Sequence, residues 1–294
     1  MQIASNTIKS VIALYKSELW GIYSDSELQN IINWIFEKQL KLNSTDIISK
    51  KEFVVNPYDI KELERMCGEL KTHKPIQYVL GEAEFYRLKF KVNESVLIPR
   101  PETEELVELI INNLKIKSPL TILDIGTGSG CIPITIKKNI PHANVFALDV
   151  STEALEIAQY NAKQSRVEVN FFQADVLSDT IIEDILKQTN KKKMDLIISN
   201  PPYVLESERK GLHNRVKSYE PSLALFVNDA DPILFYRKIA ALTKKIGAKN
   251  ASLYFECHAD YAQSVCEMLK AENFSDSCLF TDLAGLNRFV CACL

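Results

Sequence analysis

The residues with the most distinctive chemistry are Asn200-Pro-Pro-Tyr203, which follow an apolar run at residues 194–199. A run of this kind is typical of a parallel strand that is covered on both faces. Pro201 drives Asn200 toward extended backbone, and the two prolines fix two φ angles and remove two N–H donors. The sequence therefore predicts a rigid loop whose acceptors are the Asn200 side-chain oxygen and the carbonyl oxygens of Asn200 and Pro201.

Acceptors placed in this way suit a planar amino group. They can hold both of its N–H bonds and favour the pyramidal geometry in which the nitrogen lone pair can attack. Tyr203 can stack on the planar group behind that nitrogen. A Pro-Pro loop that merely ends a strand is an equally good interpretation of these four residues alone, so evidence for a reaction must come from the rest of the chain.

Polar residues or glycines also follow the ends of three successive predicted strands. Gly126-Thr-Gly-Ser-Gly130 follows the first apolar stretch, and its glycines allow a ligand to touch the main chain. Asp149 ends the next stretch about 20 residues later, where an acid can accept both hydroxyls of a ribose. Asp175 ends the third, where an acid or a backbone group can read an adenine amino group. Together these strand ends predict a nucleotide-like cofactor.

The glycine spacing favours S-adenosylmethionine over NAD. The loop reads Gly-x-Gly-x-Gly, whereas the dinucleotide fingerprint is Gly-x-Gly-x-x-Gly, and the chain contains no hydride-transfer constellation. Asp124, directly before the loop, is either a buried polar anchor or a contact near the amino-acid end of the cofactor.

The periodicity from about residue 119 alternates between strand and helix. Strands are predicted at 121–125, 145–148, 167–172, 194–199 and 252–255, with closing strands at 274–280 and 288–293. Helices are predicted at 131–136, 151–158, 231–246 and 261–270. This alternation predicts an α/β fold with a parallel sheet, whose ligands bind beyond the carboxyl ends of the strands.

Residues 1–80 are predicted to form a helical bundle. Apolar residues recur at helical spacing from Ile8, Ser24-Asp-Ser-Glu27 is a capping box, and Asn56-Pro57 is a cap followed by a first-turn proline. Basic and acidic residues are equal in number here, which argues against a groove for bare RNA or DNA. The bundle is more consistent with protein recognition or with packing.

Residues 81–100 are predicted to form a β-hairpin that links the bundle to a domain at 101–294, with a turn at Asn93-Glu94-Ser95. A helix opens at Pro101 with acidic residues at its positive end. Arg100, Glu102 and Thr103 either line a site or cap this helix, and the local sequence favours capping.

Composition narrows the class of protein. The net charge of −3 and pI near 5.9 lack the basic footprint of a general nucleic-acid binder. We expect no membrane span and no signal peptide. The seven cysteines are scattered and the four histidines isolated, so we expect reduced thiols, a cytoplasmic location and no metal site.

At this point the motifs resemble a known family. Asp124-Ile-Gly-Thr-Gly-Ser-Gly130 and Asn200-Pro-Pro-Tyr203 look like the cofactor and amino-group motifs of class I methyltransferases that modify amide or base nitrogens. Other stretches are similar to the peptide chain release factor glutamine methyltransferases, called PrmC or HemK. These stretches are Lys74-Pro-Ile-Gln-Tyr-Val-Leu-Gly81 with Glu84-Phe85, Leu97-Ile-Pro-Arg-Pro-Glu-Thr-Glu104, Tyr219-Glu-Pro-Ser-Leu-Ala224, and Asp282-Leu-Ala-Gly285 with Arg288.

The resemblance implies a helical substrate-recognition domain, a hairpin linker and a Rossmann-like catalytic domain. It implies methyl transfer from S-adenosylmethionine to the glutamine amide in the Gly-Gly-Gln motif of class I release factors, with no stable nucleic-acid partner. The implied cofactor contacts are Asp124, Gly126, Thr127, Gly128, Ser129, Gly130, Asp149, Asp175, Val176 and Asn200. The implied catalytic residues are Asn200, Pro201 and Tyr203, and substrate contacts add Pro202, Arg100 and Glu102.

The chain departs from the family pattern at Glu256-Cys257-His258, where members often carry Glu-Ile-Gly, and at Val176, where an aromatic residue can occur. Two competing functions remain. A nucleic-acid adenine methyltransferase uses the same Asn-Pro-Pro-Tyr loop, but it would want a basic face. A non-catalytic protein that binds a ribosomal partner through residues 1–80 would have no need of an intact loop and glycine motif.

Overall fold

The computed structural model describes residues 5–114 and 120–294, and it divides into two compact units. The first comprises Met1–Gly81 together with His213–Tyr219, and the second comprises Glu82–Leu212 and Glu220–Leu294. Residues 213–219 were predicted to belong to the methyltransferase domain at 101–294. In the structure, this short segment packs as part of the helical unit.

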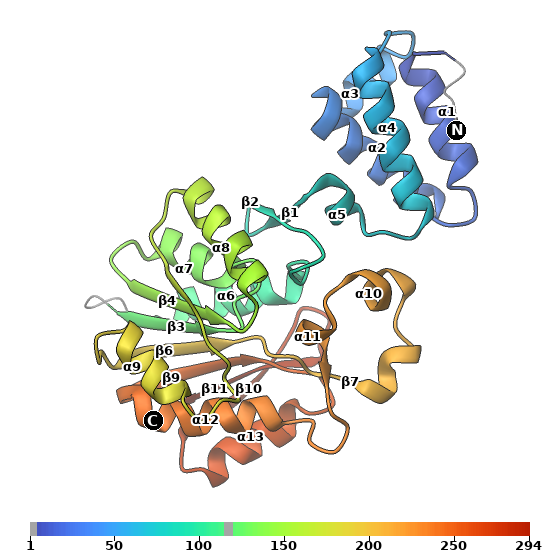
Figure 1. Ribbon diagram of the computed structural model, residues 1–294. Coiled ribbons are helices and arrows are strands. Elements are labelled where there is room, and N and C mark those ends of the chain that lie inside the picture. The colour runs from blue at the N-terminus through green and yellow to red at the C-terminus, as the bar shows by residue number, and fades with distance from the viewer. Residues whose placement is uncertain (1–4, 115–119) are drawn as a thin grey trace. The chain divides into compact units, whose positions relative to one another are not determined.

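The first unit is a bundle of short helices (Figure 1). Its helices are α1 (Ile8–Glu18), α2 (Asp25–Leu40), α3 (Ser44–Ser49), α4 (Pro57–Lys71), α5 (Ile76–Leu80) and α10 (Asn214–Tyr219). Ser24 and Asn56 cap α2 and α4 with their side chains, as their positions in the sequence predict. The Tyr15 hydroxyl, buried in the bundle core, donates to the Leu63 carbonyl over 2.7 Å and ties α1 to α4.

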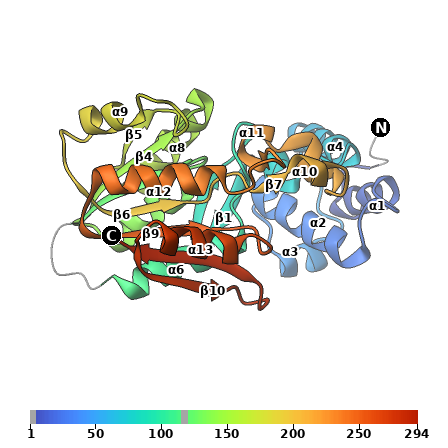
Figure 2. The ribbon, with the colours of Figure 1, turned by 90° about the horizontal axis from the view of Figure 1, so that it is seen from below.

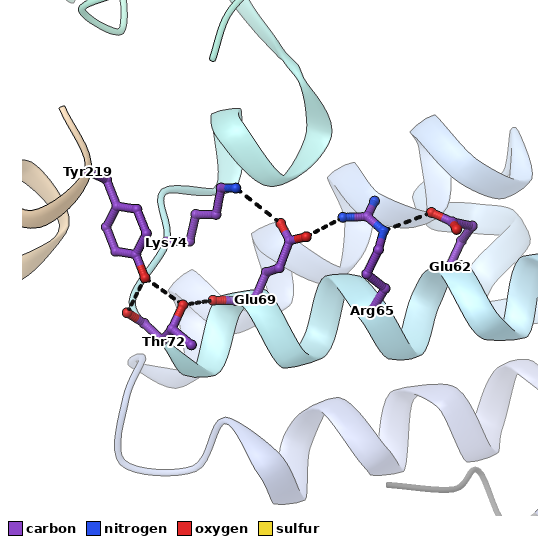
Figure 3. Close-up of polar contacts among 6 residues, drawn as sticks. All are labelled: Glu62, Arg65, Glu69, Thr72, Lys74 and Tyr219. Carbon is purple, nitrogen blue, oxygen red and sulfur yellow. Dashed lines mark hydrogen bonds and ion pairs between the residues drawn. The ribbon is translucent and has the colours of Figure 1, made fainter. Parts of the chain in front are cut away.

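Polar contacts hold α10 within this unit. The Tyr219 hydroxyl contacts the Thr72 carbonyl oxygen at 2.8 Å and the Thr72 hydroxyl at 2.6 Å, at the C-terminal end of α4 (Figure 3). The Arg215 guanidinium lies 4.4 Å from the centre of the Tyr23 ring and pairs with Glu27. These contacts join residues far apart in sequence, which explains why local periodicity does not reveal the membership of 213–219.

The second unit contains a seven-stranded sheet with the order β10-β11-β9-β6-β3-β4-β5. Its strands are β3 (Thr121–Ile125), β4 (Asn144–Asp149), β5 (Asn170–Gln173), β6 (Met194–Ser199), β9 (Gly247–Glu256), β10 (Ser275–Thr281) and β11 (Asn287–Cys293). The five strands from β9 to β5 are parallel, and β10 and β11 form an antiparallel hairpin at one edge. The predicted α/β fold is confirmed, although β5 begins at Asn170 instead of near residue 167.

Helices cover both faces of this sheet (Figure 1). One face packs against α6 (Pro101–Asn113), α7 (Cys131–Asn139) and α8 (Thr152–Ser165). The other packs against α9 (Ile181–Gln188), α12 (Leu234–Ile246) and α13 (Ala262–Ala271), and Figure 2 shows α12 and α13 side by side across it. All five residues of β3 are buried, as expected for a central parallel strand.

Residues 82–91 form the predicted hairpin, which belongs to the second compact unit, but its turn lies elsewhere than predicted. β1 (Glu82–Phe85) pairs with β2 (Leu88–Lys91), so Tyr86 and Arg87 form the turn, with φ of 48° and 62°. Two-residue hairpin turns require this left-handed backbone and usually select Asn or Gly for it. Tyr86 and Arg87 give no such signal. Asn93-Glu94-Ser95 forms a separate turn, in which the Val96 N–H donates to the Asn93 carbonyl.

Short elements complete the second unit beyond the end of β6. They are β7 (Val204–Leu205), a 3₁₀-helix η1 (Glu206–Lys210), α11 (Ser222–Leu225) and β8 (Phe226–Val227), with β7 and β8 paired in parallel. No helix within residues 5–114 and 120–294 is long and apolar enough to cross a membrane.

Candidate active site

A cavity of about 410 Å³ opens at the carboxyl ends of the parallel strands of the second unit. Its walls come from the loops after β3, β4, β5 and β6, and from the segment that precedes α6. Eleven residues predicted for the cofactor or substrate line it: Arg100, Gly126, Thr127, Gly128, Ser129, Asp149, Asp175, Val176, Asn200, Pro201 and Pro202. The cofactor motif and most of the Asn-Pro-Pro-Tyr loop therefore face one shared space.

Four predicted site residues are not among the residues that line this cavity. Asp124 is fully buried in β3, and Gly130 caps the start of α7. Glu102 lies in the first turn of α6. The Tyr203 ring makes an edge contact with His258, with ring centres 6.1 Å apart, and its hydroxyl donates to Glu256 Oε1 over 3.3 Å.

The glycine loop is held by backbone contacts to the neighbouring strand. The N–H groups of Gly126 and Thr127 both donate to the Leu148 carbonyl, over 2.9 and 3.0 Å. Gly130 has a φ of 79°, and a Cβ there would lie 2.9 Å from Ile134 Cδ1 and 3.1 Å from Ala158 Cβ. Only glycine meets both demands, because the backbone is left-handed and α8 packs directly against it.

Asp149 joins the loop to the end of β4. Its Oδ2 accepts from the Gly128 N–H over 2.8 Å, and its Oδ1 accepts from the Ser151 N–H over 3.0 Å. Burial raises the pKa of this carboxyl, while the hydrogen bonds from Ser151 and Gly128 oppose the shift. Each oxygen retains a further acceptor position, which suits the two adjacent hydroxyls of a ribose.

Three buried polar side chains around the loop lack partners in the described part of the chain. They are both carboxyl oxygens of Asp124 and the hydroxyls of Thr127 and Ser129. Unpaired buried polar groups are costly, and each such group calls for an explanation. These groups would suit the cationic amino-acid end of S-adenosylmethionine, so the residues present fit this cofactor.

Burial also raises the pKa of Asp124 to about 7, and the neighbouring Thr127 hydroxyl opposes this shift without reaching hydrogen-bond geometry. The pKa of Glu256, also fully buried, rises to about 7 mainly through burial, against the hydrogen bond from Thr103. Both carboxyls thus bind protons more tightly in the folded protein than in the unfolded chain.

We therefore expect the cofactor-free protein to lose stability as pH rises. Between roughly pH 4, where these carboxyls ionise in the unfolded chain, and pH 7, the folded state binds more protons, so the free energy of unfolding falls. The expected loss is on the order of 2–4 kcal/mol per group. Urea denaturation at pH 5 and pH 8 measures it, and Asp124→Asn should flatten the dependence. A free energy of unfolding that rises over this range would contradict the assignment.

The Asn200 loop is anchored to neighbouring elements. The Asn200 Nδ2 donates to Thr103 Oγ1 over 3.2 Å, and that hydroxyl donates to Glu256 Oε2 over 2.7 Å. The parallel register pairs Ser199 with Phe255, so Glu256 at the end of β9 lies level with Asn200. The prediction that Arg100, Glu102 and Thr103 cap α6 is wrong, because α6 has no side-chain cap hydrogen bond and the Thr103 hydroxyl bonds to Glu256 and Asn200 instead.

Arg100 lies at the cavity but is already paired. Its guanidinium donates to Glu220 Oε1 over 2.6 Å, and the Ile98 N–H donates to Glu220 Oε2 over 3.3 Å. Glu220 is buried, so its charge needs this partner. Two of the stretches that carried the family resemblance, 97–104 and 219–224, thus meet at one ion pair. A substrate contact by Arg100 would use the guanidinium N–H groups that Glu220 leaves available.

Several site residues were not predicted as such from the sequence. Asn161 in α8 is 1% exposed; its Oδ1 accepts from the Lys91 N–H, and its Nδ2 donates to the Lys91 and Ser129 carbonyls. It joins β2 to the glycine loop. Leu223 and Phe235 also line the cavity. A buried asparagine on the apolar face of α8 was the one available signal, and no local pattern distinguishes the other two residues.

Comparisons with known proteins place the chain in a family. Residues 102–216 match the model of the methyltransferase small domain, and residues 11–81 match the PrmC N-terminal domain. A relative from Flavobacterium psychrophilum named release factor glutamine methyltransferase is 42% identical over 96% of this chain and 98% of its own. A relative of the same name from Bacteroides thetaiotaomicron is 38% identical over 96% of this chain and 98% of its own length. Another from Clostridium acetobutylicum is 30% identical over 99% of this chain and 98% of its own length.

Among solved structures, a methyltransferase from Pyrococcus furiosus overlaps with a TM-score of 0.48 and 14% identity, over 71% of this chain and 89% of its own. The family assignment does not rest on that overlap. It rests on relatives that match nearly the whole chain, including both units. The fold is that of a class I methyltransferase, and its cofactor is S-adenosyl-L-methionine. With this cavity and these relatives, the chain belongs to the release factor glutamine methyltransferase family.

Proposed function

We propose that this protein methylates the side-chain amide nitrogen of the glutamine in the Gly-Gly-Gln motif of class I peptide chain release factors, in support of translation termination. The observation that carries the proposal is that Asn200 and Pro201 line the same cavity as the glycine loop and Asp149. A glutamine amide held by Asn200 and Pro201 would lie close to a cofactor held by the glycine loop and Asp149.

Bound S-adenosylmethionine supplies a methyl group on a positively charged sulfur, already activated for transfer. Asn200 Oδ1 and the carbonyl oxygens of Asn200 and Pro201 accept hydrogen bonds from the two N–H groups of the glutamine amide and so orient its nitrogen. The same acceptors would stabilise the positive charge that the nitrogen gains while its bond to the methyl carbon forms and the methyl–sulfur bond breaks with its electron pair passing to the sulfur, because these acceptors are already in place. Asn200 is no base, so the surplus proton leaves after transfer, to solvent or a nearby carbonyl.

We assign the remaining residues to supporting roles. Thr127, Ser129, Asp175 and Val176 line the cofactor side of the cavity, and Asp124 backs the glycine loop from β3. Pro202 stiffens the loop on the substrate side. Tyr203 packs beside it, in an edge contact with His258. Arg100 and Glu102, at the start of α6, border the entry of the substrate.

We also propose that residues 1–80 recognise the release factor, that 81–100 act as the linker, and that 101–294 carry out the reaction. The match of 11–81 to a domain found in this family supports the first assignment. The protein is proposed to act in the cytoplasm, where its substrate works, without a stable nucleic-acid partner.

A single assay tests the reaction. The protein is incubated with methyl-labelled S-adenosylmethionine and either a release factor, the same factor with its motif glutamine changed to alanine, RNA or DNA. We expect label in the unchanged factor alone, within a glutamine-containing peptide. Label in RNA or DNA would support the hypothesis of a nucleic-acid adenine methyltransferase. No label in any substrate would support the hypothesis of a non-catalytic binding protein.

A further inference from the structure

We propose that Glu256 and Thr103 are positioning residues that set which way the Asn200 side-chain amide faces. The inference rests on the proposed function, because it concerns the orientation of Asn200 toward the substrate nitrogen. Glu256 is 1% exposed and Thr103 2% exposed, so neither is a surface cap. The Asn200 Nδ2 donates to the Thr103 hydroxyl over 3.2 Å, and that hydroxyl donates to Glu256 over 2.7 Å.

The donors and acceptors available in this chain of side chains fix the direction of each hydrogen bond. An ionised carboxylate only accepts hydrogen bonds, so the single hydroxyl proton of Thr103 must point to Glu256. The Thr103 oxygen then has only lone pairs to offer Asn200. Of the two ends of an asparagine side chain, only the NH2 can satisfy it. The Asn200 oxygen is therefore turned away from Thr103, where it can accept from a substrate N–H.

The same carboxylate also holds the other end of the loop. Glu256 Oε1 accepts from the Tyr203 hydroxyl over 3.3 Å, while Oε2 accepts from Thr103. Asn200 and Tyr203 are thus both restrained by one buried group on β9, and Pro201 and Pro202 between them are stiff. A side-chain amide restrained at its nitrogen, in a loop restrained at both ends, loses little entropy when substrate binds.

The charge of Glu256 is what makes this arrangement directional. If Glu256 becomes protonated, it can donate to Thr103, whose hydroxyl is then free to donate to the Asn200 oxygen, and the amide can turn over. The groups that face Glu256 are Arg288 from β11, Glu102 from α6, Tyr203 from the loop after β6, Tyr236 from α12, Cys131 from α7 and the adjacent Cys257. Arg288 favours the ionised form and Glu102 opposes it.

The test compares Thr103→Val with Thr103→Ser. Valine has nearly the same shape but no hydroxyl, whereas serine keeps the hydroxyl. We expect Thr103→Val to lower kcat by about 10- to 100-fold. We expect Thr103→Ser to remain within about threefold of wild type. The Kd for S-adenosylhomocysteine, measured by calorimetry, should stay close to wild type in both. Because Thr103→Val also removes a hydrogen bond from the buried Glu256 carboxyl, kcat is compared at a temperature at which thermal unfolding shows all three proteins to be folded. A Thr103→Val variant with wild-type kcat would overturn the proposal, as would one whose cofactor affinity fell as far as its kcat.

Two further measurements separate orientation from general structural support. In wild type, kcat at saturating cofactor should rise with pH through the pKa of Glu256, and Glu256→Gln should remove that step; its persistence in Glu256→Gln would overturn the proposal. Adding Thr103→Val to Asn200→Ala should cost no further activity, because Thr103 acts through Asn200. Additive losses would place Thr103 in an independent role. If the wild-type protein does not label a release factor, the proposed function is wrong. That result is distinct from any result of the variants, which are compared with an active wild type.

Discussion

Asn200→Ala is expected to lower kcat by about 100- to 1,000-fold while leaving the Kd for S-adenosylhomocysteine within about threefold of wild type. The substitution removes the side-chain oxygen that we propose accepts a hydrogen bond from the substrate amide, and it leaves the glycine loop and Asp149 untouched. Single-turnover methylation of a release factor by labelled S-adenosylmethionine measures the first quantity. Calorimetric titration of the unreactive product, S-adenosylhomocysteine, measures the second.

The matched control is Asn139→Ala, which removes an exposed asparagine near the C-terminal end of α7. That variant should retain wild-type kcat. If Asn200→Ala weakened cofactor binding as much as turnover, Asn200 would be chiefly a cofactor contact, and its role in orienting the amide would be wrong.

Asp149→Ala is expected to raise the Kd for S-adenosylhomocysteine by about 30- to 300-fold, because the two charge-assisted hydrogen bonds that we propose between Asp149 and the ribose hydroxyls would be lost. The Gly128 N–H also loses its acceptor, so the glycine loop should become less ordered. At saturating cofactor, kcat should recover to within about fivefold of wild type, since Asp149 does not touch the substrate amide. Titration calorimetry and initial rates over a range of cofactor concentrations give both numbers.

Asp179→Ala provides the comparison, because Asp179 is an exposed aspartate that follows β5 outside the cavity lining. It should bind cofactor as wild type does. A kcat for Asp149→Ala that stayed low at saturating cofactor would show that this carboxyl contributes to the methyl transfer itself.

Buried carboxylates connect the separate motifs of this active site. Glu256 links the Thr103 and Asn200 segments, and Glu220 links Arg100 and the Ile98 backbone to the segment that follows α10. Burying a charge without a partner is costly, so each carboxylate requires hydrogen-bond donors at its oxygens. A substitution at either position should therefore affect loops far away in sequence as well as its own strand end.

The outline of the fold and much of the cavity followed from the sequence alone. The alternation of apolar runs with helical periodicity predicted the parallel sheet, and polar residues at successive strand ends predicted that their side chains would gather at one edge of it. These inferences succeed because parallel strands all point their carboxyl ends to one edge, so residues such as Asp149 and Asn200 must approach one another. The stiffness of Asn200-Pro-Pro-Tyr203 is likewise a local property of two prolines.

Only the tertiary structure decided the partners of the buried polar groups. Thr103 and Glu256 are separated by 153 positions, and Arg100 and Glu220 by 120, so no local pattern links them. Strand order places β9 beside β6, and that placement makes Glu256 the support of Asn200. The turn at Tyr86 and Arg87 and the packing of 213–219 in the helical unit were also decided there. In each case the controlling contact is long-range, and the residues concerned carry no local signal of it.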